Sequence, residues 1–470
     1  MSERIAARVL VVGGGPGGYS AAIRAGRLGL DTVLVEAGRL GGTCLIRGCI
    51  PSKALIHAAG QFAAMREAVA GGGRFGISLN QPPMLDFGET RRWIESVVGR
   101  LETGVAGLLR RAGVRVMQGW GRFFDAKTCH VATEAGEVTV TAEHVILATG
   151  SEPVALPSLP FGGAVLSSTE ALSLPGLPRR LAVIGAGYIG LELGTAFRKL
   201  GVEVTVIEAQ NRILPLWDEE LTEPVRRWLD RAGVRLHLGA QAQALQDGPD
   251  GAVLMVRTGD GGSIKVAADQ VLCTVGRRPR TQGWGIEAMA VDLEGGFVRV
   301  DDQCRTSMRN VWAIGDLVGE PMLAHKAMAQ GETVAEIIAG ARRHFAPAAI
   351  PAVCFTEPEI VSAGMLPAEA ASAGIDAVVA AFPFAANGRA LTLGGEGEGF
   401  VRVVARRDTG RLLGLQAVGA QIAELAAGFA HALEMGAMLE DLAATIHVHP
   451  TLSEAVREAA ARALGRAIHV

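Results

Sequence analysis

The chain lacks an excess of basic charge and lacks long apolar runs. Of its 470 residues, 45 are lysine or arginine and 48 are aspartate or glutamate, so the formal net charge is −3. Since no Lys/Arg-rich run stands out, we expect no nucleic-acid partner and no membrane binding. No apolar stretch is long enough to span a bilayer, and the first expected strand leaves no room for a secretion signal. These features predict a cytoplasmic protein.

Cysteine is also scarce, with six residues in the chain. That number excludes a disulfide framework. Cys44 and Cys49 stand close together between glycines and a proline, and such a pair in a reducing compartment is usually catalytic or metal-binding. The other four lie in apolar or mixed segments and are expected to be small buried side chains: Cys129, Cys273, Cys304 and Cys354.

Glycine is abundant, and part of it forms one pattern that occurs twice. Residues 8–12 predict a short apolar strand, followed by GGGPGG, a small-residue helix and a second strand that ends at Glu36. Residues 181–208 repeat this order and end at Glu208. In each copy Gly-x-Gly-x-x-Gly lies between a strand and a helix, and the acidic residue follows the last glycine by 18 positions. Two such copies in the same context indicate two dinucleotide sites.

The residue types of this pattern suit a nucleotide. The first glycine makes a tight turn, the second lets a pyrophosphate approach, and the third lets helix and strand pack closely. The helix N-terminus then faces the phosphates, and the acid binds ribose hydroxyls. For either copy alone an ordinary βα turn remains the alternative. The expected contacts are Gly13, Gly15, Pro16, Gly17, Gly18 and Glu36 in the first copy, and Gly185, Gly187, Ile189, Gly190 and Glu208 in the second.

The second site favours NAD over NADP. A carboxylate at Glu208 repels a 2′-phosphate, and no arginine cluster follows it. Arg212 is the only nearby candidate for binding such a phosphate.

The length and the order of motifs predict several domains. A prior of roughly 100–200 residues per domain gives about three or four. Strand-plus-turn segments at 144–153 and 270–279 close the two nucleotide-binding units, and an apolar strand leads to Asp316. The C-terminal third alternates strands with helices and has no further glycine motif. We therefore expect an α/β chain with two Rossmann-like domains (1–150 and 151–276), a central domain (277–348) and a C-terminal α+β domain (349–470).

The cysteine pair requires an irregular backbone. On an ideal helix, positions five apart place their Cα atoms at about 8–9 Å, whereas disulfides need less than about 7 Å. Gly48 and Pro51 are residue types that permit a distorted first turn. Zinc binding is the rival interpretation, but His57 stands alone as a nearby ligand, so we predict no metal site.

Lys53 follows Cys49 by four positions and would project from the same helix face. Only five residues of the chain are lysine, so a generic surface choice is a less natural explanation. A cation and a helix N-terminus beside Cys49 would lower the thiol pKa. The alternative is a solvated lysine.

Five segments carry a resemblance to a known family: GGTCLIRGCIPSK, GAGYIGLELG, TVGRRPRT, AIGDLVGEPMLAHKA and HVHPTLSE. Taken together, they resemble the pyridine-nucleotide disulfide oxidoreductases, and among them the dihydrolipoyl dehydrogenases. The likeness covers essentially the whole chain. Stretches such as RILP and FPFAANGRA are closest to the form that serves branched-chain 2-oxo acid dehydrogenase complexes.

The resemblance implies oxidation of protein-bound dihydrolipoyl groups with reduction of NAD, through FAD. Residues 1–150 would bind FAD, 151–276 would bind NAD, 277–348 would complete the FAD site, and 349–470 would form the interface of a homodimer. The expected partner is the lipoyl-bearing acyltransferase subunit of a 2-oxo acid dehydrogenase complex.

The resemblance also assigns roles within the site. Cys44 would exchange with substrate, and Cys49 would be the thiolate against the flavin. Lys53 would lie near the flavin and pair with Glu192, and Tyr188 would cover the nicotinamide pocket. The remaining cofactor contacts would be Gly42, Thr43, Thr149, Gly150, Asp316, Leu323, Ala324 and His325 for FAD, and Gly276 for NAD.

His449 and Glu454 would form the acid–base pair, acting on the disulfide of the other subunit. An imidazole suits this task because thiol–disulfide exchange needs a proton acceptor and a donor near neutral pH. A carboxylate five residues later can hold its tautomer. His447 is the competing candidate.

The segment between the two cysteines departs from the family pattern. Ile46 and Arg47 replace an asparagine and a small apolar residue, and Arg47 predicts an altered disulfide potential without loss of activity. The rival functions are a glutathione reductase, which would normally prefer NADP, and a mercuric reductase, which usually carries a C-terminal cysteine pair. A non-catalytic FAD-binding subunit is a third, which the retained redox residues disfavour.

Overall fold

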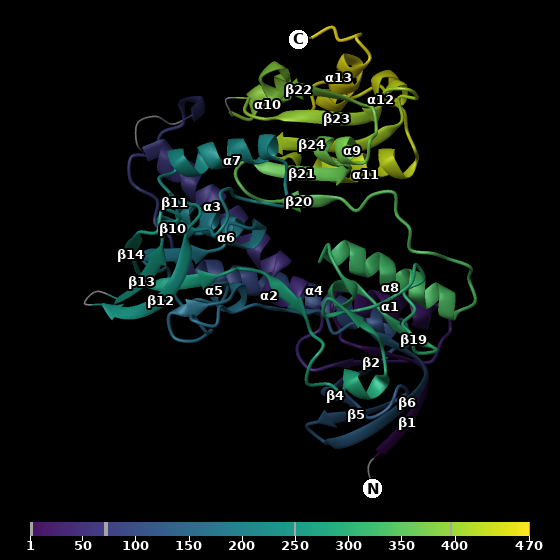
Figure 1. Cartoon of the computed structure of the whole chain (residues 1–470). Coiled ribbons are helices and arrows are strands. Elements are labelled where there is room, and N and C mark those ends of the chain that lie inside the picture. The colour runs from purple at the N-terminus through teal and green to yellow at the C-terminus, as the bar shows by residue number, and fades with distance from the viewer. Residues whose placement is uncertain (1–2, 70–73, 249–250, 395–396, 470) are drawn as a thin grey trace.

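The computed structural model describes residues 3–69, 74–248, 251–394 and 397–469. Its first unit is a sheet whose strands follow the order β3-β2-β1-β6-β5-β4, with β19 paired to β6 (Figure 1). The strands β1, β2, β3, β6 and β19 pair in parallel, whereas β4 and β5 add an antiparallel extension. The strands are β1 (Glu3–Val12), β2 (Thr32–Glu36), β3 (Arg115–Gln118), β4 (Trp120–Phe123), β5 (Thr128–Thr133), β6 (Gly136–Leu147) and β19 (Val311–Ala313).

The first strand is longer than the sequence predicts. The expected strand began at residue 8, but β1 starts at Glu3, which pairs with Val138 of β6. Residues 3–7 alternate between exposed and more buried side chains, as suits a sheet extension with one solvated face. The apolar run at residues 8–12 therefore marked only the buried part of the strand and missed its partly exposed first half.

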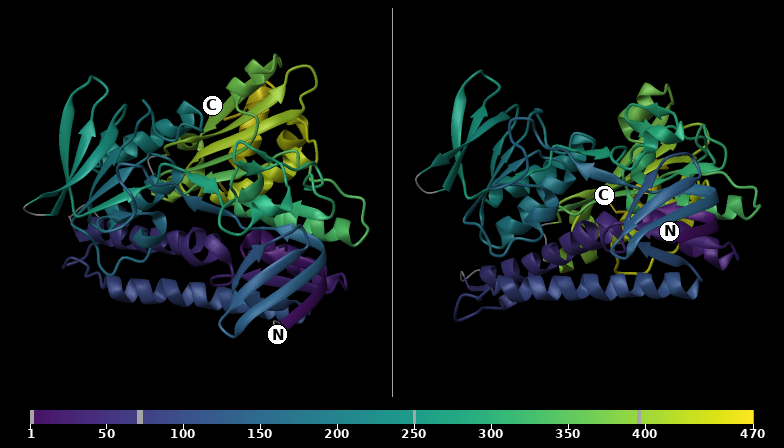
Figure 2. Two further views of the ribbon diagram at one scale, coloured as in Figure 1. Left: turned by 60° about the horizontal axis from the view of Figure 1, so that its bottom comes forward. Right: turned by 90° about the horizontal axis from the view of Figure 1, so that it is seen from below.

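Helices α1 (Pro16–Arg27) and α8 (Ala324–Ile338) pack closely together on this sheet. A Cβ atom at Gly331 would lie 2.4 Å from the carbonyl oxygen of Gly17, so only glycine permits the contact. Helices α3 (Cys49–Val69) and α4 (Phe87–Arg111) run side by side along one flank of the molecule (Figure 2). Among the described residues, none of the helices combines the length and the apolar character needed to cross a lipid bilayer.

The second unit repeats the first in smaller form. Its sheet has the order β11-β10-β9-β15-β8 with parallel pairing, and a three-stranded antiparallel sheet, β12-β13-β14, lies beside it. Helix α6 (Tyr188–Lys199) follows β9, and α7 (Glu219–Arg231) follows β10. The strands are β8 (Val165–Leu166), β9 (Arg180–Ile184), β10 (Glu203–Ile207), β11 (Arg235–His237), β12 (Gln241–Gly248), β13 (Gly251–Arg257), β14 (Ser263–Ala268) and β15 (Gln270–Cys273).

The C-terminal unit is an antiparallel sheet covered by helices, with strand order β20-β21-β24-β23-β22 (Figure 1). Its buried side chains form a cluster of their own. This agrees with the α+β character expected there. The elements are β20 (Ala352–Cys354), β21 (Glu359–Gly364), β22 (Ala377–Pro383), β23 (Phe400–Arg406), β24 (Leu412–Gly419), α11 (Ala426–Glu434), α12 (Leu439–Ala444) and α13 (Glu454–Ala463).

Residues 277–348 are built onto the first unit. The buried side chains of Trp284, Val311 and Leu317 belong to the same cluster as those of β1 and β6. Strand β16 (Arg277–Pro279) pairs with β7 (Ser151–Pro153), which directly follows the first expected domain. The exact domain boundaries stay a prediction.

Candidate active site

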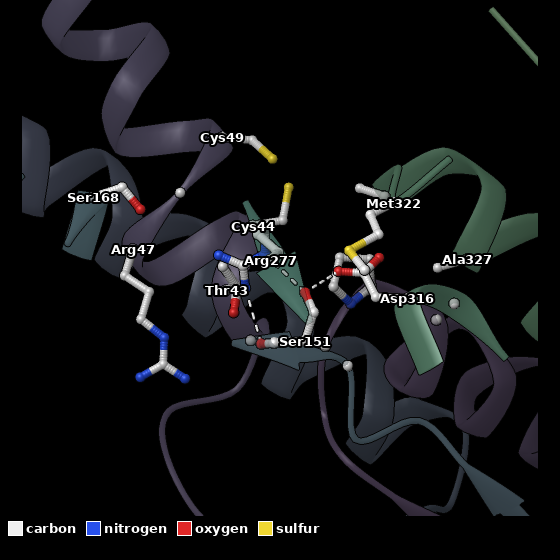
Figure 3. Close-up of a pocket in the computed structure, with 18 of the residues that line it drawn as sticks. Thr43, Cys44, Arg47, Cys49, Ser151, Ser168, Arg277, Asp316, Met322 and Ala327 are labelled. Atoms are coloured by element: carbon white, nitrogen blue, oxygen red, sulfur yellow. Dashed lines mark hydrogen bonds between the residues drawn. The ribbon is translucent and has the colours of Figure 1, made fainter. Parts of the chain in front are cut away.

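The cysteine pair lies at a break between two helices. Helix α2 (Gly42–Arg47) ends at Gly48, whose φ of −145° and ψ of −109° are not helical, and α3 begins at Cys49. A Cβ atom at Gly48 would lie 2.8 Å from the carbonyl oxygen of Thr43. The break confirms the predicted distortion and lets the two sulfurs face each other (Figure 3).

The pKa values of the two thiols are shifted in opposite directions. Both cysteines are free thiols in the structure, and the Cys44 thiol donates a hydrogen bond to Cys49. This hydrogen bond lowers the pKa of Cys49 to about 7, and the nearby Lys53 ammonium adds to the effect. The same hydrogen bond, together with burial, raises the pKa of Cys44. Cys49 is therefore the thiolate of the reduced pair.

Lys53 forms an ion pair with Glu192 of α6, with Nζ 2.7 Å from Oε2. This is the pairing that the resemblance implied. Glu192 is only 3% exposed, and its other carboxylate oxygen accepts the backbone N–H of Phe355 at 2.9 Å. A buried carboxylate with both oxygens engaged holds the ammonium firmly beside Cys49.

Arg47 contributes less to the pair than the sequence suggests. Its side chain lines the same cavity but points away from the two sulfurs (Figure 3). Lys53 is thus the cation whose charge acts on Cys49. The altered disulfide potential expected from Arg47 stays a prediction.

The cysteine pair opens into a cavity that the first glycine motif also lines. Three predicted FAD contacts are not among the residues that line this cavity: Gly18, Leu323 and His325. Gly18 is buried within α1, and Leu323 is the N-cap residue of α8. Nε2 of His325 lies 2.8 Å from the carbonyl oxygen of Pro351. Lys53, Tyr188 and Glu192 also line the cavity. The other predicted residues that line it are Gly13, Gly15, Pro16, Gly17, Glu36, Gly42, Thr43, Thr149, Gly150, Asp316 and Ala324.

The shape of the first motif fits the dinucleotide FAD. A Cβ atom at Gly18 would lie 1.8 Å from the carbonyl oxygen of Gly13, so the loop must turn tightly onto the start of α1. Glu36 accepts the N–H groups of Gly14 and Gly38, each at 2.6 Å. Because each carboxylate oxygen has two lone pairs, Glu36 holds the loop and can still accept from a ribose hydroxyl. The N-terminus of α1 lies at this cavity, since Gly15, Pro16 and Gly17 line it, and a helix N-terminus suits phosphates.

The second cavity repeats this geometry and fits NAD. A Cβ atom at Gly190 would lie 2.3 Å from the carbonyl oxygen of Gly185. Glu208 accepts the N–H groups of Ala186 at 2.6 Å and Gln210 at 2.8 Å, as Glu36 does in the first copy. The predicted residues that line this cavity are Gly185, Gly187, Tyr188, Ile189, Glu208 and Gly276.

Arg212 is not placed to bind a 2′-phosphate. Its guanidinium donates to the carbonyl oxygen of Pro215, and it is not among the residues that line the second cavity. Glu208 therefore lines the second cavity without a compensating arginine from position 212.

The two cavities share a wall made of Tyr188, Ile189, Arg277 and Met322. Tyr188 stands at the start of α6 and is 37% exposed, and burial of its hydroxyl raises its pKa to about 12. The position agrees with a residue that separates the flavin side from the nicotinamide side.

Sequence reasoning missed Ser151 and gave Arg277 no role. Ser151 donates its hydroxyl hydrogen to Asp316 at 2.5 Å and accepts from Nε of Arg277 at 2.8 Å (Figure 3). A second guanidinium nitrogen of Arg277 donates to the Ser151 carbonyl at 2.9 Å. Arg277 lies in the recognised TVGRRPRT segment, which could have signalled it, whereas Ser151 had only its place beside Gly150.

His449 and Glu454 form a pair at the far end of the C-terminal unit. Nδ1 of His449 lies 3.0 Å from Glu454, whose other oxygen accepts the N–H of Thr451 at 2.9 Å. Burial raises the pKa of Glu454, but the two hydrogen bonds and the nearby His449 and His447 together lower it overall. The His449 side chain is 79% exposed and does not line the cavity of Cys44 in its own chain.

His447 is less suited to proton transfer. Its Nδ1 lies 3.0 Å from the Ser453 hydroxyl, and burial lowers its pKa. Among the residues that the structure describes, no three histidine, cysteine or acidic side chains gather as metal ligands.

Comparison with known proteins finds one family over both halves of the chain. Residues 7–331 match the family described as pyridine nucleotide-disulphide oxidoreductase, and residues 350–460 match its dimerisation domain. The dihydrolipoyl dehydrogenase of Pseudomonas aeruginosa is 59% identical over 471 residues, covering 100% of both chains. That of Bacillus subtilis is 43% identical, covering 98% of this chain and 97% of the other.

Solved structures agree with these matches. LpdA from Mycobacterium tuberculosis superposes with a TM-score of 0.88 at 28% identity, over 97% of this chain and 99% of that chain. The flavoprotein disulfide reductase RclA from Escherichia coli has a TM-score of 0.84 at 23% identity, covering 97% and 99% of the two chains. The second likeness shows the fold alone.

Proposed function

Because this chain belongs to the pyridine nucleotide-disulphide oxidoreductases and, within them, to the dihydrolipoyl dehydrogenases, we propose a role for each group of its active site. The chain oxidises dihydrolipoyl groups to lipoyl and reduces NAD to NADH, with FAD as its bound cofactor. The observation that carries the assignment of residues is the placing of Cys44 and Cys49 in one cavity, with the second dinucleotide cavity behind Tyr188.

The substrate half of the reaction uses Cys44 and His449. Nε2 of His449 accepts the proton of a dihydrolipoyl thiol, while Glu454 holds Nδ1–H and stabilises the imidazolium. The substrate thiolate attacks Sγ of Cys44, breaks the bond to Cys49 and leaves Cys49 as a thiolate. The second substrate thiol then attacks the substrate sulfur of the mixed disulfide and forms cyclic lipoyl, which releases Cys44. Cys44 takes the proton that His449 holds, and the imidazole freed in this way accepts the proton of the attacking thiol.

The other half of the reaction begins at Cys49. Bound FAD supplies the two-electron transfer between the dithiol and NAD. The chain stabilises the Cys49 thiolate through the Cys44 hydrogen bond and the Lys53 ammonium. Ser151, Asp316 and Arg277 form the polar wall that would orient the ribityl and pyrophosphate region.

The nicotinamide side uses Tyr188 and Glu208. The Tyr188 ring lies between the two cavities and would move aside as NAD binds. Glu208 would accept ribose hydroxyl hydrogens and disfavour a 2′-phosphate. Gly276 and Ile189 line the same cavity and would contact the bound NAD, as the sequence predicts.

The assembly follows from the position of His449. The chain carries the dimerisation domain of the family. We propose that the homodimer brings His449 of one chain to Cys44 of the other. Within one chain, Cys44 lines the first cavity, whereas His449 is exposed and does not line it. The proposed partner is the lipoyl-bearing acyltransferase of a branched-chain 2-oxo acid dehydrogenase complex. A cytoplasmic location remains a prediction from the sequence.

A comparison of rates tests this proposal against its rivals. We expect NAD to be used at least about tenfold better than NADP, since the 2′-phosphate meets Glu208 without a compensating cation. Dihydrolipoamide should be oxidised, and oxidised glutathione should not be reduced. Indifference to dihydrolipoamide would exclude the assigned substrate, and a preference for NADP with glutathione would favour a glutathione reductase.

A spectrum separates the enzyme from a non-catalytic FAD-binding subunit. A yellow protein that gains long-wavelength absorbance on anaerobic reduction, through contact of the Cys49 thiolate with flavin, supports the enzyme. A spectrum that Cys49→Ser leaves unchanged would contradict it.

A further inference from the structure

Phe355 lies where three parts of the molecule meet at the Lys53–Glu192 pair. Its ring centroid is 4.5 Å from the Lys53 ammonium, which α3 carries. Its backbone N–H donates to Glu192 of α6 at 2.9 Å. Phe355 itself follows β20 of the C-terminal unit. One residue thus contacts both members of the ion pair, the acid through its backbone and the cation through its ring.

The segment that carries Phe355 is fixed independently of Lys53. Glu357 forms an ion pair with Lys199, which lies seven residues after Glu192 and therefore on the same face of α6. The side chain of Thr356 is 3% exposed, and its hydroxyl donates to the Pro358 carbonyl at 2.8 Å. The ion pair holds the segment against α6, and the Thr356 hydrogen bond fixes the conformation of the segment itself.

Lys53 is the least constrained member of the cluster. Its side chain is 33% exposed, whereas that of Glu192 is 4% exposed. A lysine side chain has several rotatable bonds and could carry its ammonium toward the cavity. The negative face of an aromatic ring attracts such an ammonium, and the attraction is stronger where water is partly excluded.

We propose that Phe355 is a positioning residue of the reaction. Its ring and its N–H hold the Lys53–Glu192 pair so that the ammonium stays beside Cys49 and stabilises the thiolate there. Through Phe355 the C-terminal unit sets the charge state of a sulfur in the FAD-binding unit. This inference rests on the roles given above to Cys49 and Lys53.

The charged and titratable groups around Cys49 come from several elements. Cys44 of α2 and Lys53 of α3 lower its pKa, and Glu192 of α6 opposes them. The phenols of Tyr19 on α1 and Tyr188 on α6 also lie near enough to interact with its charge. Lys53 is the cation of this set, so its position decides how well the thiolate is stabilised.

The experiment titrates the Cys49 thiolate in the FAD-containing dimer. In Cys44→Ser the second sulfur is absent while a hydroxyl donor remains, so the long-wavelength thiolate–flavin absorbance reports Cys49 alone. Adding Phe355→Leu removes the ring and keeps the N–H. We expect the midpoint of this absorbance to rise by about 0.5 to 1 pH unit.

Matched variants separate positioning from packing. Phe355→Tyr restores the ring and should restore the midpoint. Phe382→Leu, a ring loss in the buried core of the same unit, should leave it unchanged. Together with Lys53→Met, Phe355→Leu should add no further shift, because the ring acts through the ammonium.

The outcomes are distinguishable. A midpoint that Phe355→Leu leaves unchanged, or that Phe382→Leu shifts equally, would overturn the positioning role. Absence of any titrating band in Cys44→Ser would overturn the role of Cys49 and this inference with it. If Phe355→Leu does not fold, Phe355→Met removes the ring with a closer match in volume and should give the same upward shift.

Discussion

Cys44 and Cys49 lie side by side but have different acidities. The Cys44 thiol donates to Cys49 and adds to the effect of Lys53 on the Cys49 pKa. A donor to the charged form of an acid lowers its pKa, and a thiol that must give up this interaction on ionising has a raised one. The asymmetry gives the thiolate to the sulfur assigned to the flavin and leaves the proton on the sulfur assigned to the substrate.

The hydrogen bond from position 44 should be visible in a pH titration. In Cys44→Ser a hydroxyl still donates to Cys49, whereas in Cys44→Ala no donor remains. Since the donor stabilises the thiolate, its loss should raise the midpoint of the thiolate–flavin absorbance by about one pH unit. In both variants the absorbance should fall as pH drops below the midpoint, because the thiolate is the absorbing form. Equal midpoints would show that the hydrogen bond does not set the pKa.

At the scale of elements, α1 and α6 begin in the same way. Each follows a parallel strand, each starts from a loop that only glycine permits, and each loop is held by a carboxylate from the next strand. The two copies can therefore be disturbed separately. A change in the second loop should affect NAD without affecting the flavin half of the reaction.

Gly190→Ala tests this separation. The new Cβ atom would lie 2.3 Å from the Gly185 carbonyl oxygen and 2.6 Å from the Thr274 hydroxyl, so the loop must shift. We expect the KM for NAD to rise at least about tenfold, since the nucleotide depends on close approach to this loop. Reduction of the flavin by dihydrolipoamide in a single turnover should stay near the wild-type rate.

Gly194→Ala is the matched control, on the same helix. Its Cβ atom would meet only ordinary contacts at 3.6 Å, with Val183 and Val204. The KM for NAD should therefore change little. An equal effect of both substitutions would attribute the loss to helix α6 in general instead of the loop.

The elements also show what sequence reasoning can and cannot supply. The glycine motifs and the acid that follows each of them are local patterns, so the two glycine loops and their carboxylates were predictable from the sequence. The break at Gly48 was predictable from the spacing of Cys44 and Cys49. Phe355 gave no such signal, because its partners Lys53 and Glu192 are brought to it only by the packing of three units. The direction of Arg47 was equally hidden, since spacing does not determine where a flexible side chain points.

At the scale of the whole molecule, Arg402 joins the C-terminal unit to the NAD-binding unit. From β23 it reaches Glu220 at 2.8 Å and Asp218 at 3.2 Å, and its side chain is 3% exposed. Asp218 caps α7 and follows Trp217, which lines the second cavity. The buried guanidinium therefore connects the dimerisation sheet with the wall of the nucleotide site.

Arg402→Met should weaken this connection. Of its two partners, Asp218 is 16% exposed and would lose a buried cation, whereas Glu220 is 74% exposed and would stay solvated. We therefore expect a fall in the thermal unfolding midpoint and a higher KM for NAD. Arg406→Met is the control, because its partner Asp408 is on the surface and such pairs contribute about 0–1 kcal/mol. Equal changes in the two variants would show that burial of Arg402 has no special effect.

The assembly can be tested by mixing inactive chains. His449→Gln and Cys44→Ser should each give an inactive homodimer. In a mixed dimer, the intact cysteine pair of one chain faces the intact His449 of the other, so one of its two sites should work. Random pairing in a twofold dimer then restores about a quarter of the wild-type activity.

The alternative arrangement gives a different result. If His449 acted on the cysteines of its own chain, every site in the mixture would lack one group, and mixing would restore nothing. Co-expression with two different tags, followed by purification through both, isolates the mixed dimer and doubles the expected signal to about half of wild type.

The wall of Tyr188 and Arg277 between the two cavities has a consequence for kinetics. With Cys44 in one cavity and Glu208 in the other, the proposed substrate and NAD sites are separate, so we expect neither to block the other's entrance. The chain itself stores the two electrons between the visits. Each substrate therefore reacts with its own form of the enzyme, and initial rates should follow a ping-pong pattern, with parallel double-reciprocal lines instead of intersecting ones.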